Sequence, residues 1–423
     1  MKNLLLLVVG ALLGAGSLFY FHLKPAPIPE IEHHTDVAAA YAQFAAAVGE
    51  AGEFVQAHQW YGSEREQAEA YRHIARVLMS SIPEALLIDK DFPDFYEIGP
   101  FNKSGMDNSD QRYLSTIVDG AGNYRVWGRR GTSRRLEVSV YEEDAMSKTL
   151  ASLDASQLIV DEKGAFEIIL GGEERAGNWL PLQPGRKRVL VRQIFSNWDV
   201  ERPGDVHIDR IDRGRPLYPV MNNKEMAERL VRTTNLFATN VRRWPEYSRT
   251  RFDALMPANR LTPPQNVADS GGLAGRVMVG GHFNLKPNEA MVIKAWPTEA
   301  NYQGIQLGHH WWESLDYANR QSSLTADQAA VSADGAIYYV IAQEDPGTAN
   351  WLDTEGFSRG VILMRYDGIA GARLASEQKP TARVVKLSDL ERVLPVNEPK
   401  VNPDQRSEQT RKRREHVQRR FGL

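Results

Sequence analysis

The tripeptide Asn-Trp-Leu occurs twice in this chain, at Asn178–Leu180 and at Asn350–Leu352. A hairpin signal precedes each copy at nearly the same separation, Lys163-Gly164 before the first and Asp334-Gly335 before the second. The stretch of chain between the two copies is as long as a whole domain, so this repeat constrains the fold more than any local pattern does. We therefore predict two related domains that arose by internal duplication.

Two further features agree with this repeat. An arginine closes a strongly apolar run in each copy, Arg192 in the first and Arg365 in the second. We also align Asn123-Tyr124 with Asn301-Tyr302. The Asn-Trp-Leu tripeptide itself is most simply a corner, because asparagine tolerates unusual backbone angles and tryptophan supplies a large apolar plug.

Short runs of β-branched and aromatic residues dominate the chain after position 91, and glycine, asparagine and aspartate separate them. Such spacing is typical of antiparallel β-sandwiches. Before position 91 and again near 223–241, the apolar residues recur at helical spacing. We expect an α+β fold that is predominantly β, with two related antiparallel β-sandwich or jelly-roll-like domains and flanking helices. The expected segments are a signal anchor or transmembrane helix (1–22), a proline-rich spacer (23–35), a helical segment (36–90), a first β domain (91–219), a connecting helix and loop (220–260), a second β domain (261–396) and a basic C-terminal helix (397–423).

The N-terminal run from Leu4 to Phe21 carries no charge and is long enough to cross a bilayer as a helix. A cleaved signal peptide is the alternative, and a buried helix is a third interpretation. Because the run ends in aromatic residues and prolines follow, we favour an uncleaved anchor. We therefore expect a membrane-anchored protein whose bulk faces the periplasm or cell exterior, with a secreted form as the alternative.

Composition excludes several classes of function. The net charge is −3, which gives no bulk electrostatic attraction for nucleic acid. The chain has no cysteine, so disulfides and thiolate metal sites are absent. Neighbouring histidines on a strand point to opposite faces, so His309 and His310 do not predict a metal site. No P-loop, dinucleotide fingerprint or nucleophile elbow is present, and we expect neither a metal nor a cofactor.

The string from Asp345 to Gly360, with Leu315–Arg320 ahead of it, resembles the domain-of-unknown-function 1214 family. The segments 124–132, 172–180 and 413–417 resemble the same family, so the resemblance covers about residues 60–420. It implies a sandwich-type β or α+β fold and often a bacterial envelope location, and it implies no established reaction. Many relatives lack an anchor like that at Leu4–Phe21, so the expected location depends on this segment.

Polar residues gather in the second copy. The catalytic candidates are His309, His310, Asp345, Asp353 and Glu355, because carboxylates beside histidines can perform general acid–base chemistry. The alternative is that loops between strands collect polar residues without any site.

Candidate ligand-binding residues lie in the same region. They are Trp311, Trp312, Asn350, Trp351 and Arg365. Aromatic rings could stack on an amphipathic ligand and the guanidinium could hold an anionic one, whereas a corner and an internal ion pair are the structural alternatives.

The tail from Arg406 to Arg420 is rich in arginine. A basic helix can lie on anionic lipid, or it can pack Val417 and Phe421 on the domain, and we favour packing.

Three functions remain open from the sequence. The first is an extracytoplasmic ligand-binding or accessory protein for a small amphipathic or anionic ligand. The second is a hydrolase- or lyase-type enzyme with an acid and histidine site in the second domain. The third is an envelope scaffold.

Overall fold

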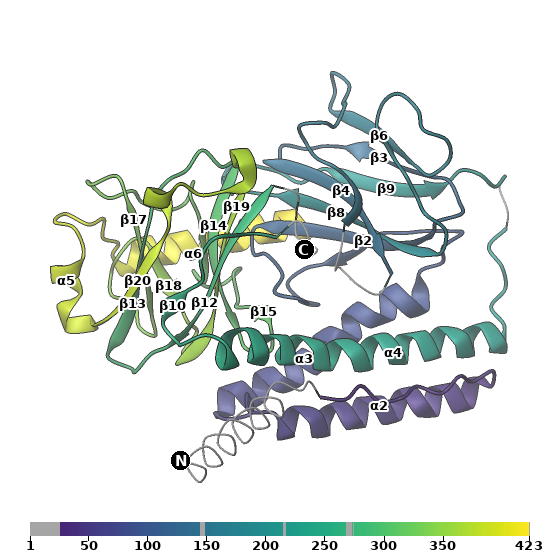
Figure 1. The fold of residues 1–423 in the computed structure, drawn as a ribbon, viewed down its shortest axis with the longest axis horizontal. Helices are drawn as coiled ribbons and strands as arrows, with labels where there is room; N and C mark the ends of the chain where they lie inside the picture. The colour runs from purple at the N-terminus through teal and green to yellow at the C-terminus, as the bar shows by residue number, and fades with distance from the viewer. Residues whose placement is uncertain (1–25, 144–148, 215–216, 268–272, 274, 423) are drawn as a thin grey trace, which may run out of the picture.

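The computed structural model describes residues 26–143, 149–214, 217–267, 273 and 275–422, and it is a β-rich α+β fold with four sheets. Two β domains lie side by side above a layer of long helices (Figure 1). The anchor expected at 1–22 lies outside the described residues. Among the helices of the described ranges, none combines the length and apolar character needed to cross a bilayer.

Three helices form the layer beneath the β domains: α2 (Val37–Ala57), α3 (Glu64–Ile82) and α4 (Asn223–Ser248). Helix α3 begins with a capping box, because Ser63 and Glu66 each bond the other's backbone N–H. The apolar faces of these helices share one core, which also takes in Trp311 of the second β domain. One π-helical turn follows α3 and another follows α4: η1 (Pro83–Leu87) and η2 (Arg249–Ala254).

The first β domain is a two-sheet sandwich whose facing strands share one apolar core. One sheet has the strand order β1 (Tyr96–Ile98), β2 (Gln111–Asp119), β8 (Arg186–Ile194), β4 (Arg135–Glu142) and β5 (Thr149–Leu153). The other has the order β7 (Trp179–Leu180), β6 (Ala165–Leu170), β3 (Tyr124–Arg129) and β9 (Asp205–Arg210).

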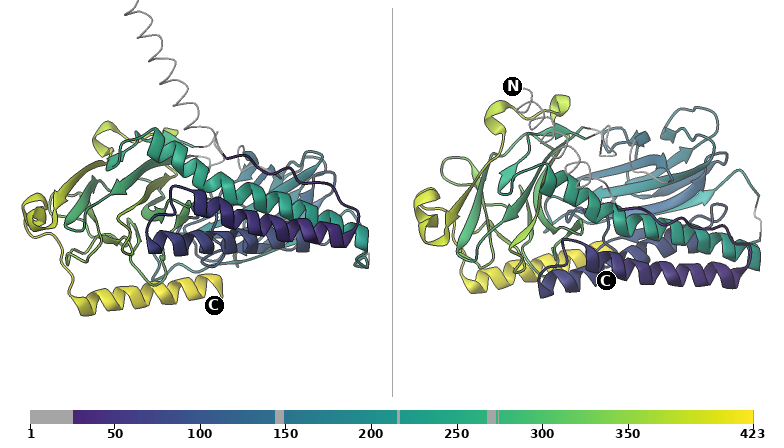
Figure 2. Two further views of the ribbon diagram at one scale, coloured as in Figure 1. Left: turned by 90° about the horizontal axis from the view of Figure 1, so that it is seen from below. Right: turned by 60° about the horizontal axis from the view of Figure 1, so that its bottom comes forward.

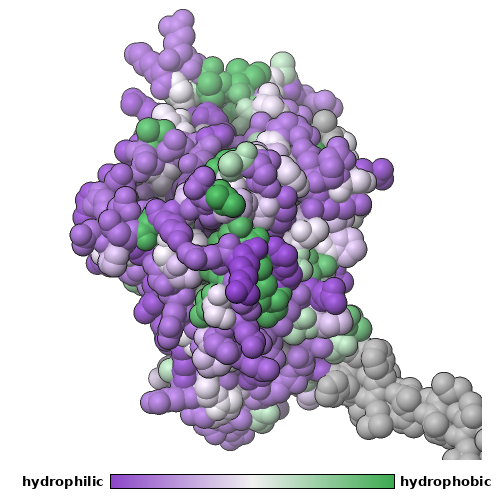
Figure 3. Space-filling model, turned by 90° about the vertical axis from the view of Figure 1, so that its left-hand side faces the viewer, coloured by the Kyte–Doolittle hydropathy of each residue, from purple (hydrophilic) through white to green (hydrophobic). Residues whose placement is uncertain are grey.

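The second β domain is also a two-sheet sandwich around a shared core. Its larger sheet has the order β10 (Arg260–Leu261), β12 (Arg276–Asn284), β19 (Arg359–Asp367), β14 (Tyr302–His309) and β15 (Glu313–Ser314), with β11 (Gln265–Asn266) on β12 and β16 (Ser323–Thr325) on β14. Its smaller sheet has the order β18 (Trp351–Asp353), β17 (Ile337–Ala342), β13 (Glu289–Ala295) and β20 (Thr381–Lys386). Its outer end is mainly hydrophilic, with small separate apolar patches (Figure 3).

The two domains follow the same path. The order β2-β8-β4 in the first matches β12-β19-β14 in the second, and β7-β6-β3-β9 matches β18-β17-β13-β20. Within each domain the only described parallel pair is the equivalent one, β6 with β7 and β17 with β18. Arg192 and Arg365 lie on the matching strands β8 and β19. Our alignment of Tyr124 with Tyr302 is wrong, because Tyr124 begins β3 whereas Tyr302 begins β14, the counterpart of β4.

The C-terminal helix α6 (Pro403–Phe421) runs along the second domain, and its C-terminal end reaches the first domain (Figure 2). Arg413 donates to the carbonyl of Ser323 in the second domain at 2.9 Å. Arg420 donates to the carbonyl of Ser109, just before β2, at 2.5 Å. This helix therefore packs on the protein through buried arginines as well as through its apolar residues. Between β19 and α6 lie η4 (Ala370–Ala372), η5 (Ser376–Gln378), η6 (Leu387–Asp389) and α5 (Leu390–Val393).

Candidate functional site

A cavity of about 310 Å³ opens where α3, the segment 100–103, the loop 314–319 after β15, and α6 meet. Each of these elements comes from a different part of the chain, so the cavity exists only in the folded protein. Its wall contains His309 and Glu355 from the second domain, together with Glu69 and Arg76 from α3. We call it the His309 cavity.

His309 is the last residue of β14 and is only 3% exposed. Neither ring nitrogen has a hydrogen-bond partner within the described residues. Burial lowers the pKa of His309 to about 4, although the charges of Glu313 and Glu69 act to raise it. The ring is therefore neutral at pH 7 and offers one donor and one acceptor, and an unpaired buried polar group of this kind costs stability.

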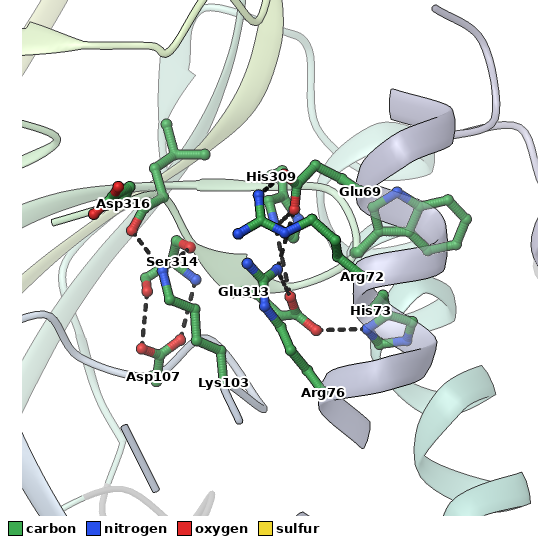
Figure 4. Close-up of polar contacts among 12 residues, drawn as sticks. Glu69, Arg72, His73, Arg76, Lys103, Asp107, His309, Glu313, Ser314 and Asp316 are labelled. Carbon is green, nitrogen blue, oxygen red and sulfur yellow. Dashed lines mark hydrogen bonds and ion pairs between the residues drawn. The ribbon is translucent and has the colours of Figure 1, made fainter. Parts of the chain in front are cut away.

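Glu313 lies beside His309 and is held firmly (Figure 4). Its carboxylate lies 2.7 Å from His73 Nδ1 and accepts a hydrogen bond from Arg76 Nη1 at 2.5 Å. Burial acts to raise the pKa of Glu313, but Arg76 and His73 outweigh it and lower this pKa to about 2. Arg76 also donates to Glu69 at 3.1 Å, so one guanidinium links two carboxylates. The oxygens nearest to His309 are therefore anionic and already bound.

A buried lysine fixes the loop that forms one wall of the cavity. Lys103 donates to the carbonyls of Ser314 and Leu315, both at 2.8 Å, and Asp107 accepts from Ser314 N and Oγ at 3.1 and 2.8 Å (Figure 4). Burial lowers the pKa of Lys103 and raises that of Asp107. These bonds leave the loop little freedom, which keeps the cavity in one shape.

Glu355 has a positive φ of 55°, a left-handed conformation that non-glycine residues rarely adopt. Its backbone N–H donates to Asp353 Oδ1 at 2.7 Å, and its carboxylate accepts from the backbone of Asp316 and from Arg65 Nη2. Burial raises the pKa of Glu355. The turn thus directs the Glu355 carboxylate to the cavity wall.

The five catalytic candidates do not form one site. His309 and Glu355 line the cavity. His310 points the other way, as expected for neighbouring strand residues, with Nδ1 3.0 Å from Ser248 Oγ. Asp345 is bound by Arg406 Nε at 2.9 Å, and Asp353 accepts from the side chain of Arg320 at 2.8 Å. The expectation of a single acid and histidine cluster is therefore corrected to the pair His309 and Glu355.

The two tryptophans proposed as ligand platforms are packing residues instead. Trp311 is buried in the core of the helical layer, where its ring stacks on His73 at 5.7 Å between centroids. Trp312 is buried against η2, where its ring stacks on Phe252 at 5.2 Å. Neither ring lines the His309 cavity. Both rings are buried at the junction between the second β domain and the helices, where they help to join the two.

Asn350 is also structural. Its side-chain amide exchanges two hydrogen bonds of 2.8 Å with the backbone of Ala330. Asn178 makes the same exchange with Ile159, at 2.8 and 2.7 Å. Both corners therefore use asparagine to fix a neighbouring segment, and Asn350 is removed from the ligand-binding candidates.

Trp351 and Arg365, the last two ligand-binding candidates, also have structural roles. The indole N–H of Trp351 donates to the carbonyl of Ala342 at 3.0 Å, and its ring is buried in a core beneath α5. Arg365 donates to Gln306 Oε1 at 2.6 Å and to the carbonyl of Met106 at 3.0 Å. The polar groups of both side chains are therefore hydrogen-bonded inside the protein, and neither side chain lines the cavity.

Sequence reasoning missed Glu69, Arg76 and Lys103. Glu69, Arg72 and Arg76 are spaced three and four residues apart, which places them on one face of α3. This polar face was a usable signal, but nothing in the sequence indicates that it meets His309. Within the described ranges, no group of three or more carboxylate or imidazole side chains is arranged to hold a metal ion.

No family model and no curated protein matches the chain. Among solved structures, an uncharacterised protein from Burkholderia cenocepacia is similar, with a TM-score of 0.75 and 29% sequence identity over 82% of this chain and 97% of that one. A protein from Vibrio parahaemolyticus matches over 75% of this chain and 97% of its own, at 12% identity and a TM-score of 0.43. The first similarity supports the overall fold and brings no activity with it.

Proposed function

We propose that this protein binds a small amphipathic or anionic molecule in the His309 cavity and acts as a ligand-binding or accessory protein. One observation carries the proposal: the buried ring of His309 lines a cavity, and neither ring nitrogen makes a hydrogen bond within the described residues. Buried polar groups are nearly always paired, so an unpaired imidazole at a cavity wall marks a candidate binding site.

The shape of the site supports a binding role. The cavity volume is at the lower end of the range of about 300–1,000 Å³ for small-molecule sites. Its wall is held by buried hydrogen bonds that Lys103 donates and Asp107 accepts, so the site is preformed. A preformed site avoids the entropic cost of ordering loops on binding.

A ligand screen by thermal shift and native mass spectrometry tests this proposal. We expect at least one small molecule to raise the melting temperature of the protein and to lose this effect in His309→Phe. A matched control is His207→Phe, since His207 is half-exposed on β9 in the first domain. The proposal fails if every stabilising compound acts equally on the wild type and on His309→Phe.

An enzyme of hydrolase or lyase type is the second candidate, and one observation favours it. Burial raises the pKa of Glu355 and lowers that of His309, and both line one cavity. Titratable groups whose pKa values are shifted in this way are typical of acid–base sites. The test is Glu355→Gln, which should abolish turnover of a bound compound while leaving its binding intact. An envelope scaffold without a small-molecule site remains the third candidate, and it predicts that no compound binds.

We also propose a membrane location, on the strength of the uncharged run from Leu4 to Phe21. Carbonate extraction of membranes from cells that make the full chain tests this. An anchored protein stays in the pellet, whereas a cleaved protein is released and begins after the run.

We infer that the chain belongs to the domain-of-unknown-function 1214 family and arose by internal duplication. The matching strand orders and the paired roles of Asn178 and Asn350 support duplication. If this inference is wrong, the proposed ligand binding is unaffected, since that proposal depends on the cavity alone.

A further inference from the structure

The lining of the His309 cavity carries more cations than acids. Two of the cations are buried and have a carboxylate behind the wall, Glu313 for Arg76 and Asp107 for Lys103. The other two are exposed, so the positive charge that a ligand meets lies on the solvent side of the cavity. The four cationic side chains of the lining are Arg72, Arg76, Lys103 and Arg414, and the three acidic ones are Glu69, Asp316 and Glu355.

The three carboxylates of the lining are already bonded within the protein. Each accepts at least two hydrogen bonds, so none of them is left to neutralise a further cation. The donors are Arg72 and Arg76 for Glu69, the backbone and side-chain amide of Asn319 for Asp316, and Arg65 together with the Asp316 backbone N–H for Glu355.

Arg414 on α6 is the cation of this lining that lacks an acidic partner within the described residues. It is exposed, and its Nη1 donates to Asn319 Oδ1, which belongs to a neutral amide. The Asn319 amide donates in turn to Asp316 at 2.8 Å, so this chain of bonds holds the guanidinium at the cavity. A guanidinium has five N–H donors in a planar arrangement that matches two oxygens of a carboxylate or phosphate. The free donors of Arg414 therefore favour an oxyanion.

An aromatic ring lies on the same lining. Phe101 is 60% exposed, so its ring offers an apolar surface to a molecule that enters. The volume of the cavity limits the size of that molecule. An apolar cavity of about 150 Å³ holds benzene, so a cavity of about 310 Å³ has room for one ring or a short chain together with an acidic group.

We propose that the ligand of the His309 cavity is a small organic acid, with one carboxylate or phosphate group on an aryl or short alkyl body. The oxyanion pairs with Arg414 beside the exposed Arg72, and the body packs on Phe101. This inference depends on the proposed binding function and selects an anionic amphipathic ligand. It needs no bond to His309, whose Nε2 faces Glu69 and Glu313.

The test is calorimetry and saturation-transfer NMR on the full chain. The anionic probes are phenylacetate, octanoate and phenyl phosphate, and the neutral counterpart of the first is phenylacetamide. We expect phenylacetate to bind about tenfold more tightly than phenylacetamide, because a charge-assisted pair with Arg414 is lost in the amide. The difference should shrink when the salt concentration is raised from 20 mM to 500 mM, because the pair is exposed. Comparison of phenylacetate with phenyl phosphate shows which oxyanion the site prefers.

Two variants locate the bound probe. Arg414→Gln should make phenylacetate and phenylacetamide bind alike, and Phe101→Ala should weaken both about threefold to tenfold through loss of one aromatic contact. Arg411→Gln is the matched control, since Arg411 is exposed on the same helix, pairs with Glu408 and Glu415 and does not line the cavity. All three side chains are exposed, so these variants should fold.

Each other outcome is decisive. Equal binding of phenylacetate and phenylacetamide to the wild type would overturn this inference and leave the proposed binding function standing. An anion preference that survives in Arg414→Gln would also overturn it, as would a thermal-shift screen that finds only neutral or cationic ligands. Failure of every probe, together with failure of that broader screen, would overturn both proposals.

Discussion

Nε2 of His309 lies 3.5 Å from Oε2 of Glu69, so the end of β14 meets the polar face of α3. Nε2 is also 3.6 Å from Glu313 Oε2, and neither approach has hydrogen-bond geometry. The helical layer thus supplies one side of the cavity and the second β domain supplies the other. A break in this contact should affect both the stability of the protein and its binding site.

Loss of the Glu313 charge should destabilise the protein strongly. Glu313→Gln removes the carboxylate that pairs with buried Arg76 and His73 and leaves Arg76 with Glu69 as its remaining carboxylate partner. Breaking a buried pair in this way costs about 3–5 kcal/mol of the free energy of unfolding. Urea denaturation measures it. The control is Glu391→Gln, whose exposed partner is Lys400, and it should leave the denaturation midpoint unchanged. Equal midpoints for wild type and Glu313→Gln would contradict the account.

Acid should weaken the fold through His309. Its pKa is about 4 in the folded protein and about 6.5 when unfolded, so the unfolded chain takes up the proton first as the pH falls. Stability from this group is therefore full above about pH 6.5 and declines as the pH approaches 4, by up to about 3 kcal/mol. Denaturation of the wild type and of His309→Asn at pH 7, 5.5 and 4.5 tests this. The difference between the two proteins should change with pH, and a constant difference would show that His309 does not titrate as described.

The two corner asparagines should differ in importance. Asn350 is 1% exposed, whereas Asn178 is half-buried, although both make the same exchange of hydrogen bonds. Asn350→Ala leaves the part-buried N–H and C=O of Ala330 unpaired and should cost about 1–2 kcal/mol of stability. Asn178→Ala should cost less, because water can replace the amide. Calorimetry measures the melting temperature of each variant. A larger loss of stability in Asn178→Ala than in Asn350→Ala would contradict the prediction that burial decides the cost.

The buried arginines of α6 should stabilise the fold. Arg413 donates to the carbonyls of Tyr317, Arg320 and Ser323, so Arg413→Ala leaves several buried acceptors unpaired. We expect a loss of about 2–4 kcal/mol in the free energy of unfolding. Arg411→Ala is the matched control on the same helix, because Arg411 is exposed and pairs only with Glu408 and Glu415. If both variants melt at the same temperature as wild type, α6 does not stabilise the fold.

Much of the architecture could be predicted, because it follows from local rules and from the repeat. The capping box at Ser63 and Glu66 and the glycine turns at Gly164 and Gly335 each depend on neighbouring residues only. The repeat of Asn-Trp-Leu indicated two related domains, and the structure gives both the same strand order.

The site could be predicted only in part, because its residues meet through long-range packing. His309 and Glu355 were identified from the density of polar residues, but their partners Glu69 and Arg76 come from a helix more than two hundred residues away. Trp311 and Trp312 have the composition of a ligand platform, yet they are buried at a junction between elements. Exposure, which decides between these roles, cannot be read from the residue type.

The most direct test of the ligand site is the nitrogen NMR spectrum of the histidine rings, recorded while a probe that binds by calorimetry is added. His310 is the internal reference, because its ring is stacked on Trp60 at 4.0 Å and faces away from the cavity. Ligand binding should shift the ring nitrogen resonances of His309 and leave those of His310 unchanged. Unchanged His309 resonances at saturating ligand would contradict it.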